Sequence, residues 1–379
     1  MPRQLWRALA LTTVATLALG TAASAPALAH GKHGHHAPDR VTDVIELNGP
    51  RGVESIRPGL TLVSEADASF SLVIERRHRE ARKISLGSIP GAEGIAPAVA
   101  AGRHGTVYVL TGAGEPGGPG GKLYRWHRRS GVRLVADIAA YQAGDPDPYD
   151  LEELPEESNP YGLEALRDGS LLVVDAAGND LLRVWPGRHH RKTRIRTVAE
   201  FEPRTVAFPE GLPETDPEGN PLPPAGTMMP SESVPTSVTV GKDGYWYVGE
   251  LRGFPATPGT SQVWRIKPTS KRTATCDPEK PWRRDCKRYA DGFTSITDMA
   301  SDRRGNVYAL SLSTQGWLAM ELGAEGSEVG ALHRIDRRRR VREVAEGQLV
   351  LPGGVDVARN GTIYGVGPLF GPGSLHTIR

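Results

Sequence analysis

Five acidic and amide side chains are the first candidates for chemistry: Glu65, Asn159, Asp175, Asn179 and Glu250. Each lies in an expected loop beside a run of strand-forming residues. Carboxylate and amide oxygens are the ligands that Ca²⁺ prefers. Asp175, Asn179 and Glu250 therefore suggest a calcium site, provided that the fold brings their loops together. The alternative stays open, because Asp and Asn commonly bond to loop backbone and no contiguous calcium loop of the EF-hand type is present.

A second candidate metal site lies near the start of the chain. Residues 30–36 read HGKHGHH, and closely spaced imidazoles on a flexible chain bind transition metals such as copper. His33, His35 and His36 are the ligands we would assign. A flexible tail with incidental metal affinity would show the same pattern.

The two cysteines are Cys276 and Cys286. An even count at short spacing in an exported chain predicts a disulfide that closes a surface loop. A zinc site or a catalytic thiol is the alternative, but no histidine lies near the pair and the spacing is not that of a zinc knuckle.

The first residues have the layout of a secretory signal peptide. Arg3 and Arg7 precede an apolar run that ends near Leu19, and small residues lead to Ala29. This predicts cleavage after Ala29, so we expect a secreted or otherwise extracytoplasmic protein with no transmembrane segment. Residues 1–29 hold two arginines and no acid, so the formal charge of +2 falls to zero in the mature chain. A balanced charge argues against nucleic acid as a partner.

The elements that must position these side chains follow from an internal repeat. Six turn glycines each precede a run of strand formers: Gly59, Gly105, Gly169, Gly244, Gly305 and Gly361. Third strands follow, such as residues 123–126, 182–184, 263–266, 332–335 and 375–378, and fourth strands at residues 132–135, 195–198 and 341–344. Short strands at regular spacing with 45 glycines and 31 prolines indicate an all-β chain. Four antiparallel strands per copy and six copies predict a six-bladed β-propeller.

The two ends of the repeat fit each other. The last copy stops at Arg379 after its third strand, and residues 41–47 supply a strand ahead of the first copy. We expect the N-terminal strand to complete the last blade, since closure removes an exposed sheet edge. The predicted organisation is a signal peptide at 1–29, a histidine-rich flexible tail at 30–39 and a propeller at 40–379.

At these residues the chain resembles NHL-type six-bladed propellers, and more closely the ScyD/ScyE family of exported proteins. The matching stretches begin at Asn159, Val174, Pro235, Tyr247 and Phe293, the last one ending at Asp298. The resemblance runs from about residue 40 to the end. It implies the propeller fold and export, but no established activity and no catalytic residues.

In such a propeller, the loops between blades and those between second and third strands gather at one mouth of the channel, where ligand sites form. The five candidates lie in those loops, as do Asp67 and Asp298. Two insertions, at about 144–158 and 202–235, could form a lid or a solvated acidic face. Basic runs at 76–83, 127–129, 188–192 and 337–340 should form a rim at the opposite turns, for anionic polymers or simply for solubility.

The sequence holds no Gly-x-Ser-x-Gly, phosphate-binding loop or His-Glu-x-x-His motif. We therefore expect a monomeric binding or scaffold propeller that takes a small molecule, glycan or protein at the loop-rich mouth. The alternative is a calcium-dependent hydrolase or lactonase, by analogy with gluconolactonase-like propellers. Calcium is the cofactor that this alternative would use.

Overall fold

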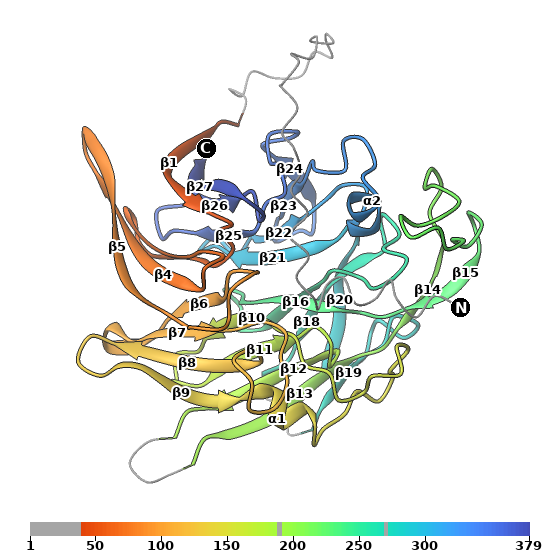
Figure 1. Ribbon diagram of the computed structural model, residues 1–379, viewed down its shortest axis with the longest axis horizontal. Helices are drawn as coiled ribbons and strands as arrows, with labels where there is room; N and C mark the ends of the chain where they lie inside the picture. Colours follow the sequence, from red (N-terminus) through yellow and green to blue (C-terminus); the bar gives the residue numbers. More distant parts are fainter. Residues whose placement is uncertain (1–38, 188–191, 269–271) are drawn as a thin grey trace.

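The six turn glycines form six tight turns, as the sequence predicts. Their φ angles lie between 74° and 92°, a region that glycine enters without a steric cost. In the computed structural model, which describes residues 39–187, 192–268 and 272–379, each of these turns joins the first two strands of an antiparallel sheet. The sheets stand around one axis in a ring (Figure 1). The chain is therefore a six-bladed β-propeller.

The blades have the following strands, from the channel outward. Blade 1 contains β2 (Val53–Arg57), β3 (Leu60–Ser64), β4 (Ser69–Arg76) and β5 (Arg79–Ser88); blade 2 contains β6 (Ala98–Ala101), β7 (Val107–Leu110), β8 (Lys122–His127) and β9 (Gly131–Asp137); blade 3 contains β10 (Pro160–Ala165), β11 (Leu171–Asp175), β12 (Asp180–Trp185) and β13 (Arg194–Phe201). Blade 4 contains β16 (Pro235–Val240), β17 (Trp246–Glu250), β18 (Ser261–Ile266) and β20 (Cys286–Phe293); blade 5 contains β21 (Ile296–Ser301), β22 (Val307–Ser311), β23 (Ala331–Ile335) and β24 (Val341–Val344); blade 6 contains β25 (Gly354–Val357), β26 (Ile363–Gly367), β27 (Pro372–Ile378) and β1 (Val41–Asn48).

The predicted closure of the ring is confirmed. β1 pairs antiparallel with β27, from Val41 opposite Ile378 to Asn48 opposite Pro372. The pairing continues past the strand ends, because Arg40 and Arg379 exchange two backbone hydrogen bonds of 2.7 and 3.1 Å. Figure 1 shows β1 beside the C-terminal strands. The first described strand thus completes the last blade.

Three strands of the blades differ from the sequence-based assignment. The basic run at 76–83 is not only a turn, since Arg79–Lys83 lies inside β5. The alternating residues before it form β4, which the arginines concealed. The fourth strand of blade 4 is β20, a polar segment that follows an insertion and has little apolar alternation.

Short elements lie outside the regular blades. β14 (Arg204–Ala207) pairs with β15 (Met228–Ser231), and β19 (Ala274–Cys276) joins the outer edge of blade 3 by parallel pairing with β13. The helices are α1 (Ile138–Gln142) and α2 (Trp317–Glu321), and the 3₁₀ turn η2 covers Arg103–Gly105. Helices among the described residues are too short to cross a membrane.

Antiparallel order gives the ring two different faces. The turn face carries the hairpins between strands one and two and between strands three and four. The loop face carries the connections between strands two and three and those from one blade to the next. Both insertions, α1 and α2 lie on the loop face.

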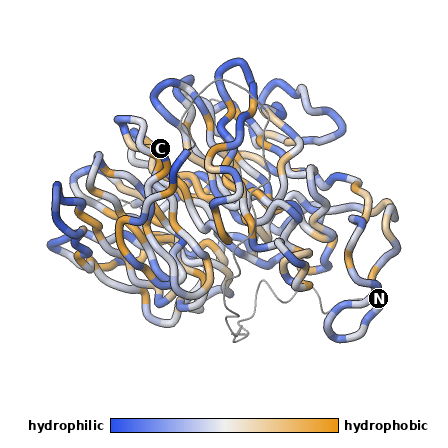
Figure 2. The backbone as a smooth tube through the Cα atoms, turned by 90° about the horizontal axis from the view of Figure 1, so that it is seen from above, coloured by the Kyte–Doolittle hydropathy of each residue, from blue (hydrophilic) through white to orange (hydrophobic). Residues whose placement is uncertain are grey.

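Apolar side chains pack between neighbouring blades, and Figure 2 shows apolar strands inside with hydrophilic loops projecting from them. A separate apolar cluster lies on the loop face, above blades 4 to 6. Its buried members come from the 202–235 insertion and from three other loops: Phe208, Leu222, Leu251, Phe254, Ala256, Leu312, Trp317, Leu318 and Leu369. The second insertion is therefore anchored by packing on this face.

Candidate functional site

Asp175 supports the turn that follows β11. One carboxylate oxygen accepts a hydrogen bond from Ser158 Oγ at 2.7 Å, and the other accepts backbone N–H groups of Asn159, Ala177 and Gly178. The side chain is fully buried. Burial raises the pKa of Asp175, while the hydrogen bonds from Ser158, Asn159 and Gly178 act in the opposite direction. These contacts are those of a side chain that organises loop backbone.

Asn179 joins the two insertions. Its amide nitrogen donates to Asp147 at 2.9 Å and to Glu232 at 3.1 Å, and its amide oxygen accepts the N–H of Val234 at 2.8 Å. Glu232 also accepts the N–H of Leu151. One asparagine therefore holds residues of the 144–158 insertion next to residues of the 202–235 insertion.

Glu250 is one half of a buried ion pair beneath the apolar cluster. Its carboxylate accepts hydrogen bonds from Arg252 and Trp264, and from Ser233 Oγ at 2.8 Å. Burial raises the pKa of Glu250, and the positive charge of Arg252 lowers it. The guanidinium is almost fully buried as well, so a cation at Glu250 would have to displace it.

The last two candidates lie on the loop face, away from that pair. Glu65 accepts the N–H of Asn48 at 3.0 Å and pairs with Lys83 at 2.7 Å. Asn159 lies immediately before β10, and its N–H group donates to Asp175. The fold thus brings Asp175, Asn159 and Asn179 together around one turn. Glu250 contacts Ser233, the neighbour of the residue that Asn179 binds. Glu65 lies apart from them, in blade 1.

Metal ligation at these residues stays a prediction. Across residues 39–187, 192–268 and 272–379, no group of three or more His, Cys, Asp or Glu side chains has an arrangement that could hold a metal ion. His33, His35 and His36 lie outside the described residues. The disulfide prediction is confirmed, because Cys276 and Cys286 are bonded, with their Cα atoms 5.2 Å apart.

A different set of acids lines the central channel. Glu54, Glu164, Asp298 and Asp356 come from the innermost strands of blades 1, 3, 5 and 6, and they border one cavity of about 180 Å³. Only Asp298 was a candidate from the sequence, and it was assigned to a loop. The structure places it in β21. The other three were missed.

Strand register explains why these acids meet. Glu54, Glu164 and Asp356 each lie opposite the third residue after their turn glycine, which is Leu62, Leu172 or Tyr364. They therefore share one level of the channel. Asp298 lies opposite Leu310, the fifth residue after Gly305, and thus one layer nearer the loop face. Counting from the turn glycines in each copy would have found this layer.

Three of the acids bridge neighbouring blades. Glu54 accepts the N–H of Ala101 in blade 2, Asp298 accepts the N–H of Val355 in blade 6 at 2.8 Å, and Asp356 accepts the N–H of Ser55 in blade 1 at 2.6 Å. Innermost strands leave one edge unpaired, so these carboxyl groups satisfy N–H groups that would otherwise lack a partner.

Glu164 is the exception. Within the described part of the chain, its carboxyl group forms no hydrogen bond with protein. Burial raises the pKa of Glu164 well above its usual value, and the charges of Glu54, Asp356 and Asp298 raise it further. Glu164 is thus the channel acid whose oxygen atoms are free to contact a ligand.

The other three channel acids also hold protons more tightly than usual. Burial and the charge of Asp356 raise the pKa of Glu54 to about 8, although the N–H of Ala101 acts against this. Burial raises the pKa of Asp298 to about 7 and that of Asp356 to about 6. At neutral pH the channel therefore holds ionised and protonated carboxyl groups side by side.

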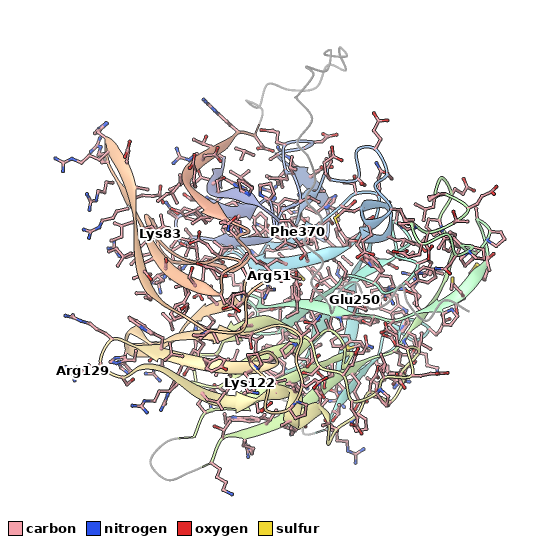
Figure 3. The ribbon with its side chains drawn as sticks, in the orientation of Figure 1. Arg51, Lys83, Lys122, Arg129, Glu250 and Phe370 are labelled. Carbon is pink, nitrogen blue, oxygen red and sulfur yellow. A yellow bond between two sulfur atoms is a disulfide. The ribbon has the colours of Figure 1, made fainter. Side chains whose placement is uncertain are left out.

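Arg51 crosses the channel on the loop-face side of these acids. Its guanidinium donates to Ala96 O at 2.7 Å and to Tyr161 O at 2.8 Å, and it stacks on the Tyr161 ring, 3.9 Å from the centroid. Tyr161 in turn contacts Thr297 of blade 5 through their hydroxyl groups, at 3.3 Å. Figure 3 shows Arg51 near the centre of the ring. These contacts join blades 1, 3 and 5 across the channel.

Two solved structures with TM-scores above 0.5 agree with the overall fold. The putative oxidoreductase (glucose dehydrogenase) of Thermus thermophilus has a TM-score of 0.53 and 18% identity, covering 90% of this chain and 100% of that one. A Bacteroides thetaiotaomicron protein of unknown function has a TM-score of 0.53 and 10% identity, covering 90% and 76%. Virginiamycin B lyase of Staphylococcus aureus has a TM-score of 0.47 and 14% identity, covering 89% and 99%.

Identities this low show the shared fold alone. No protein family and no curated protein matches the chain.

Proposed function

We propose that this chain is an exported binding propeller whose central channel takes a small organic cation, such as a primary amine, at its carboxyl groups. The observation that carries the proposal is the convergence of Glu54, Glu164, Asp298 and Asp356 on one cavity. Like charges at short range repel, which keeps some of these groups protonated, and a cation among them favours their ionised forms.

Hydrogen bonding favours an ammonium group. Three of the acids already accept backbone N–H groups of the next blade, whereas Glu164 has both oxygens available. An ammonium group has several donors and needs acceptors arranged around it. The cavity of about 180 Å³ is smaller than the pockets that hold drug-sized ligands, which suits an alkylamine or the amino end of a longer molecule.

Entry from the turn-face side fits the channel contacts. On the loop-face side, Arg51 is held by two carbonyl oxygens and by the Tyr161 ring. A ligand arriving there would have to break these contacts. The binding site we propose is thus deeper than the loop-rich mouth expected from the sequence, but it lies on the same axis.

Thermal unfolding with and without 1,4-diaminobutane tests the proposal. We expect the diamine to raise the Tm of the wild type, since a ligand at one hundred times its Kd stabilises a protein by about 3 kcal/mol. Glu164→Gln should abolish the shift. The matched control is Glu46→Gln, because Glu46 is an exposed acid on β1.

Two outcomes would decide against an amine. An unchanged wild-type Tm would do so, and so would an equal shift in Glu164→Gln. A Tm that responds to calcium and not to the diamine would favour the metal-dependent hydrolase or lactonase instead. The calcium arm therefore belongs in the same experiment.

Export and membership of the ScyD/ScyE family belong to the same proposal. The disulfide Cys276–Cys286 supports an oxidising compartment, and the stretches matching that family support the kinship. The predicted signal peptide, residues 1–29, lies outside the described residues. N-terminal sequencing of protein recovered from outside the producing cells should read from His30, and an intact Met1 would contradict export with cleavage.

A further inference from the structure

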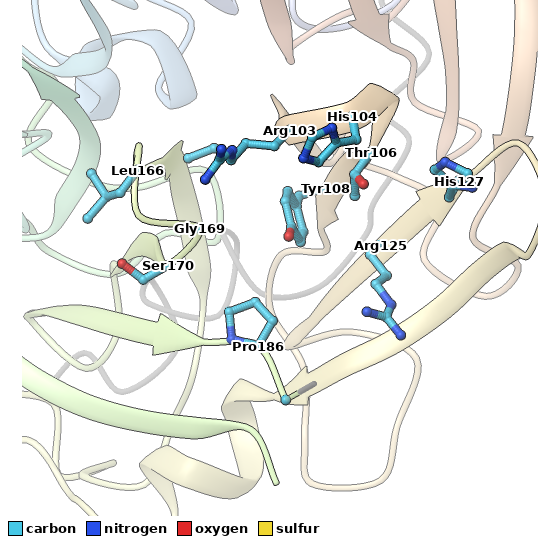
Figure 4. Close-up of a pocket in the computed structure, with 13 residues that line it drawn as sticks. Arg103, His104, Thr106, Tyr108, Arg125, His127, Leu166, Gly169, Ser170 and Pro186 are labelled. Atoms are coloured by element: carbon cyan, nitrogen blue, oxygen red, sulfur yellow. The ribbon is translucent and has the colours of Figure 1, made fainter. Parts of the chain in front are cut away.

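A cleft on the turn face, between blades 2 and 3, has a chemistry opposite to that of the channel. Its volume is about 420 Å³, and its lining includes Arg103, His104, Tyr108 and Arg125 of blade 2 with Ser170 of blade 3. Figure 4 shows these side chains bordering the same space. The acids of the channel do not line this cleft, so it is a separate place on the molecule.

The other blades show how basic residues at the equivalent positions are neutralised. In blades 2 to 5, an arginine on the third strand lies directly opposite an arginine or lysine on the fourth strand. The four pairs are Arg125 with Arg133, Arg183 with Arg196, Arg265 with Lys287, and Arg334 with Arg342. Like charges in directly opposed positions destabilise a sheet, so a nearby anion stabilises each pair. In blade 5 a base, Arg304, precedes the turn glycine, and the anion comes from outside the blade, since Arg342 pairs with Asp39 at 3.1 Å.

Blades 3 and 4 supply that anion from their own turns. The residue before the turn glycine is Asp168 in blade 3 and Asp243 in blade 4. Asp168 pairs with Arg183 at 2.5 Å, and Asp243 pairs with Arg265 at 2.9 Å. The same arrangement therefore occurs twice, with an aspartate of the turn bound to the arginine of the third strand.

Blade 2 has a histidine at the equivalent position. His104 precedes Gly105, and Arg103 precedes His104. The side chains of Arg103 and Arg125 form no hydrogen bond or ion pair with another described residue. The turn of blade 2 thus adds positive charge beside Arg125, where the turns of blades 3 and 4 add negative charge.

The backbone of this turn is also unusual. His104 has φ 56° and ψ 34°, a left-handed conformation that costs a non-glycine residue about 1 kcal/mol or more. Asn, Asp and glycine adopt it at less cost. Asp168, which precedes the lining residue Gly169, is already engaged by Arg183 and Ser170. None of the described residues that line the cleft is an acid.

We infer that this cleft binds a phosphate-type oxyanion between Arg103, His104 and Arg125, in the role that the aspartate carboxylate has in blades 3 and 4. Arginine is suited to this because its planar guanidinium donates two parallel hydrogen bonds to an oxyanion. A volume of about 420 Å³ exceeds that of the anion alone. The remainder can hold the organic part of a phosphorylated small molecule, next to the Tyr108 ring.

Isothermal titration with inorganic phosphate and with glucose 6-phosphate tests this inference. Tighter binding of the sugar phosphate would indicate a phosphorylated small molecule, and equal affinity would indicate the free anion. Both results support an oxyanion site. Absence of binding of both probes to the wild type would overturn it.

Two variants locate the site. His104→Asp installs the carboxylate found in blades 3 and 4, at a residue type that tolerates the left-handed conformation, and Arg125→Gln removes one cation. Each should weaken phosphate binding by roughly 10- to 100-fold, the loss expected for one hydrogen bond to a charged group. His104→Asp should also unfold no more easily than the wild type, because Asp tolerates the left-handed conformation and replaces a basic side chain in a positively charged turn.

The matched control is Asn360→Asp. Asn360 precedes the turn glycine Gly361 of blade 6, and the residue on the third strand there is Thr377 rather than an arginine. This variant adds a negative charge to the same face and should bind phosphate like the wild type. Equal weakening in Asn360→Asp and His104→Asp would show that general charge, not this cleft, governs binding, and the inference would fail.

Discussion

Replacing Glu54 by glutamine should make the stability of the protein less sensitive to pH. The pKa of Glu54 rises from 4.5 to about 8 in the folded protein, first because of burial and then because of the charge of Asp356. Between these values the folded state keeps a proton that the unfolded state releases. The free energy of unfolding therefore falls as pH rises from 4.5 towards 8, and it levels off above that.

The size of the effect follows from the pKa shift. The difference between 4.5 and about 8, at about 1.4 kcal/mol per unit, gives an upper limit of about 5 kcal/mol. Glutamine cannot ionise, and its amide oxygen can still accept the N–H of Ala101. The variant should consequently match the wild type at about pH 5 and exceed it by up to about 5 kcal/mol at about pH 8.

Urea unfolding at a series of pH values measures this difference. The wild type, Glu54→Gln and the exposed-acid control Glu46→Gln are compared in the same buffers. The wild type and Glu46→Gln should lose stability in parallel as pH rises, and Glu54→Gln should lose less. If all three curves stay parallel from about pH 5 to pH 8, Glu54 ionises normally and the reasoning about the channel is wrong.

Three further predictions concern stability. A chain that starts after Pro50 lacks β1 and the buried Leu47, so it should lose most of the roughly 5–15 kcal/mol that a domain has; a thermal melt like that of the mature chain would contradict the closure. Glu250→Ala leaves the Arg252 guanidinium buried without its carboxylate and should cost about 3–5 kcal/mol in urea unfolding; a cost below about 1 kcal/mol would show that the pair is not buried as described. Replacing Cys276 and Cys286 by serine opens a loop of sequence separation 10 and should cost up to about 3 kcal/mol; reduction of the wild type with dithiothreitol should have the same effect, and a Tm insensitive to both would rule out a stabilising disulfide.

The fold was predictable because its signals are local and repeated. Each blade contains a glycine with positive φ between two strand-forming runs, and six copies show which glycines matter. The closing strand followed from counting, since the last copy lacked one strand and residues 41–47 were left over. Where alternation was weak, as in β20, or concealed by arginines, as in β4, the strands were missed.

The candidate site was harder to predict, because an acid near a turn has two very different uses. One oxygen of Asp175 accepts backbone N–H groups, two of them only two and three residues away, and no spacing rule distinguishes that from a metal ligand. The channel acids depend on register instead. Glu54 and Glu164 are distant in sequence and lie at the same level only when each strand is counted from its own turn glycine.

The mutual hydrogen bonds of Arg40 and Arg379 have a consequence for how the chain can be rearranged. Residues at the two ends of the ring lie side by side, so a short linker from Arg379 to Arg40 would join them without disturbing blade 6. New termini could then be opened at the exposed hairpin of residues 128–130, between β8 and β9. In such a circular permutant, β27 and β1 become consecutive strands of one hairpin, and blade 2 becomes the blade assembled from both ends of the polypeptide.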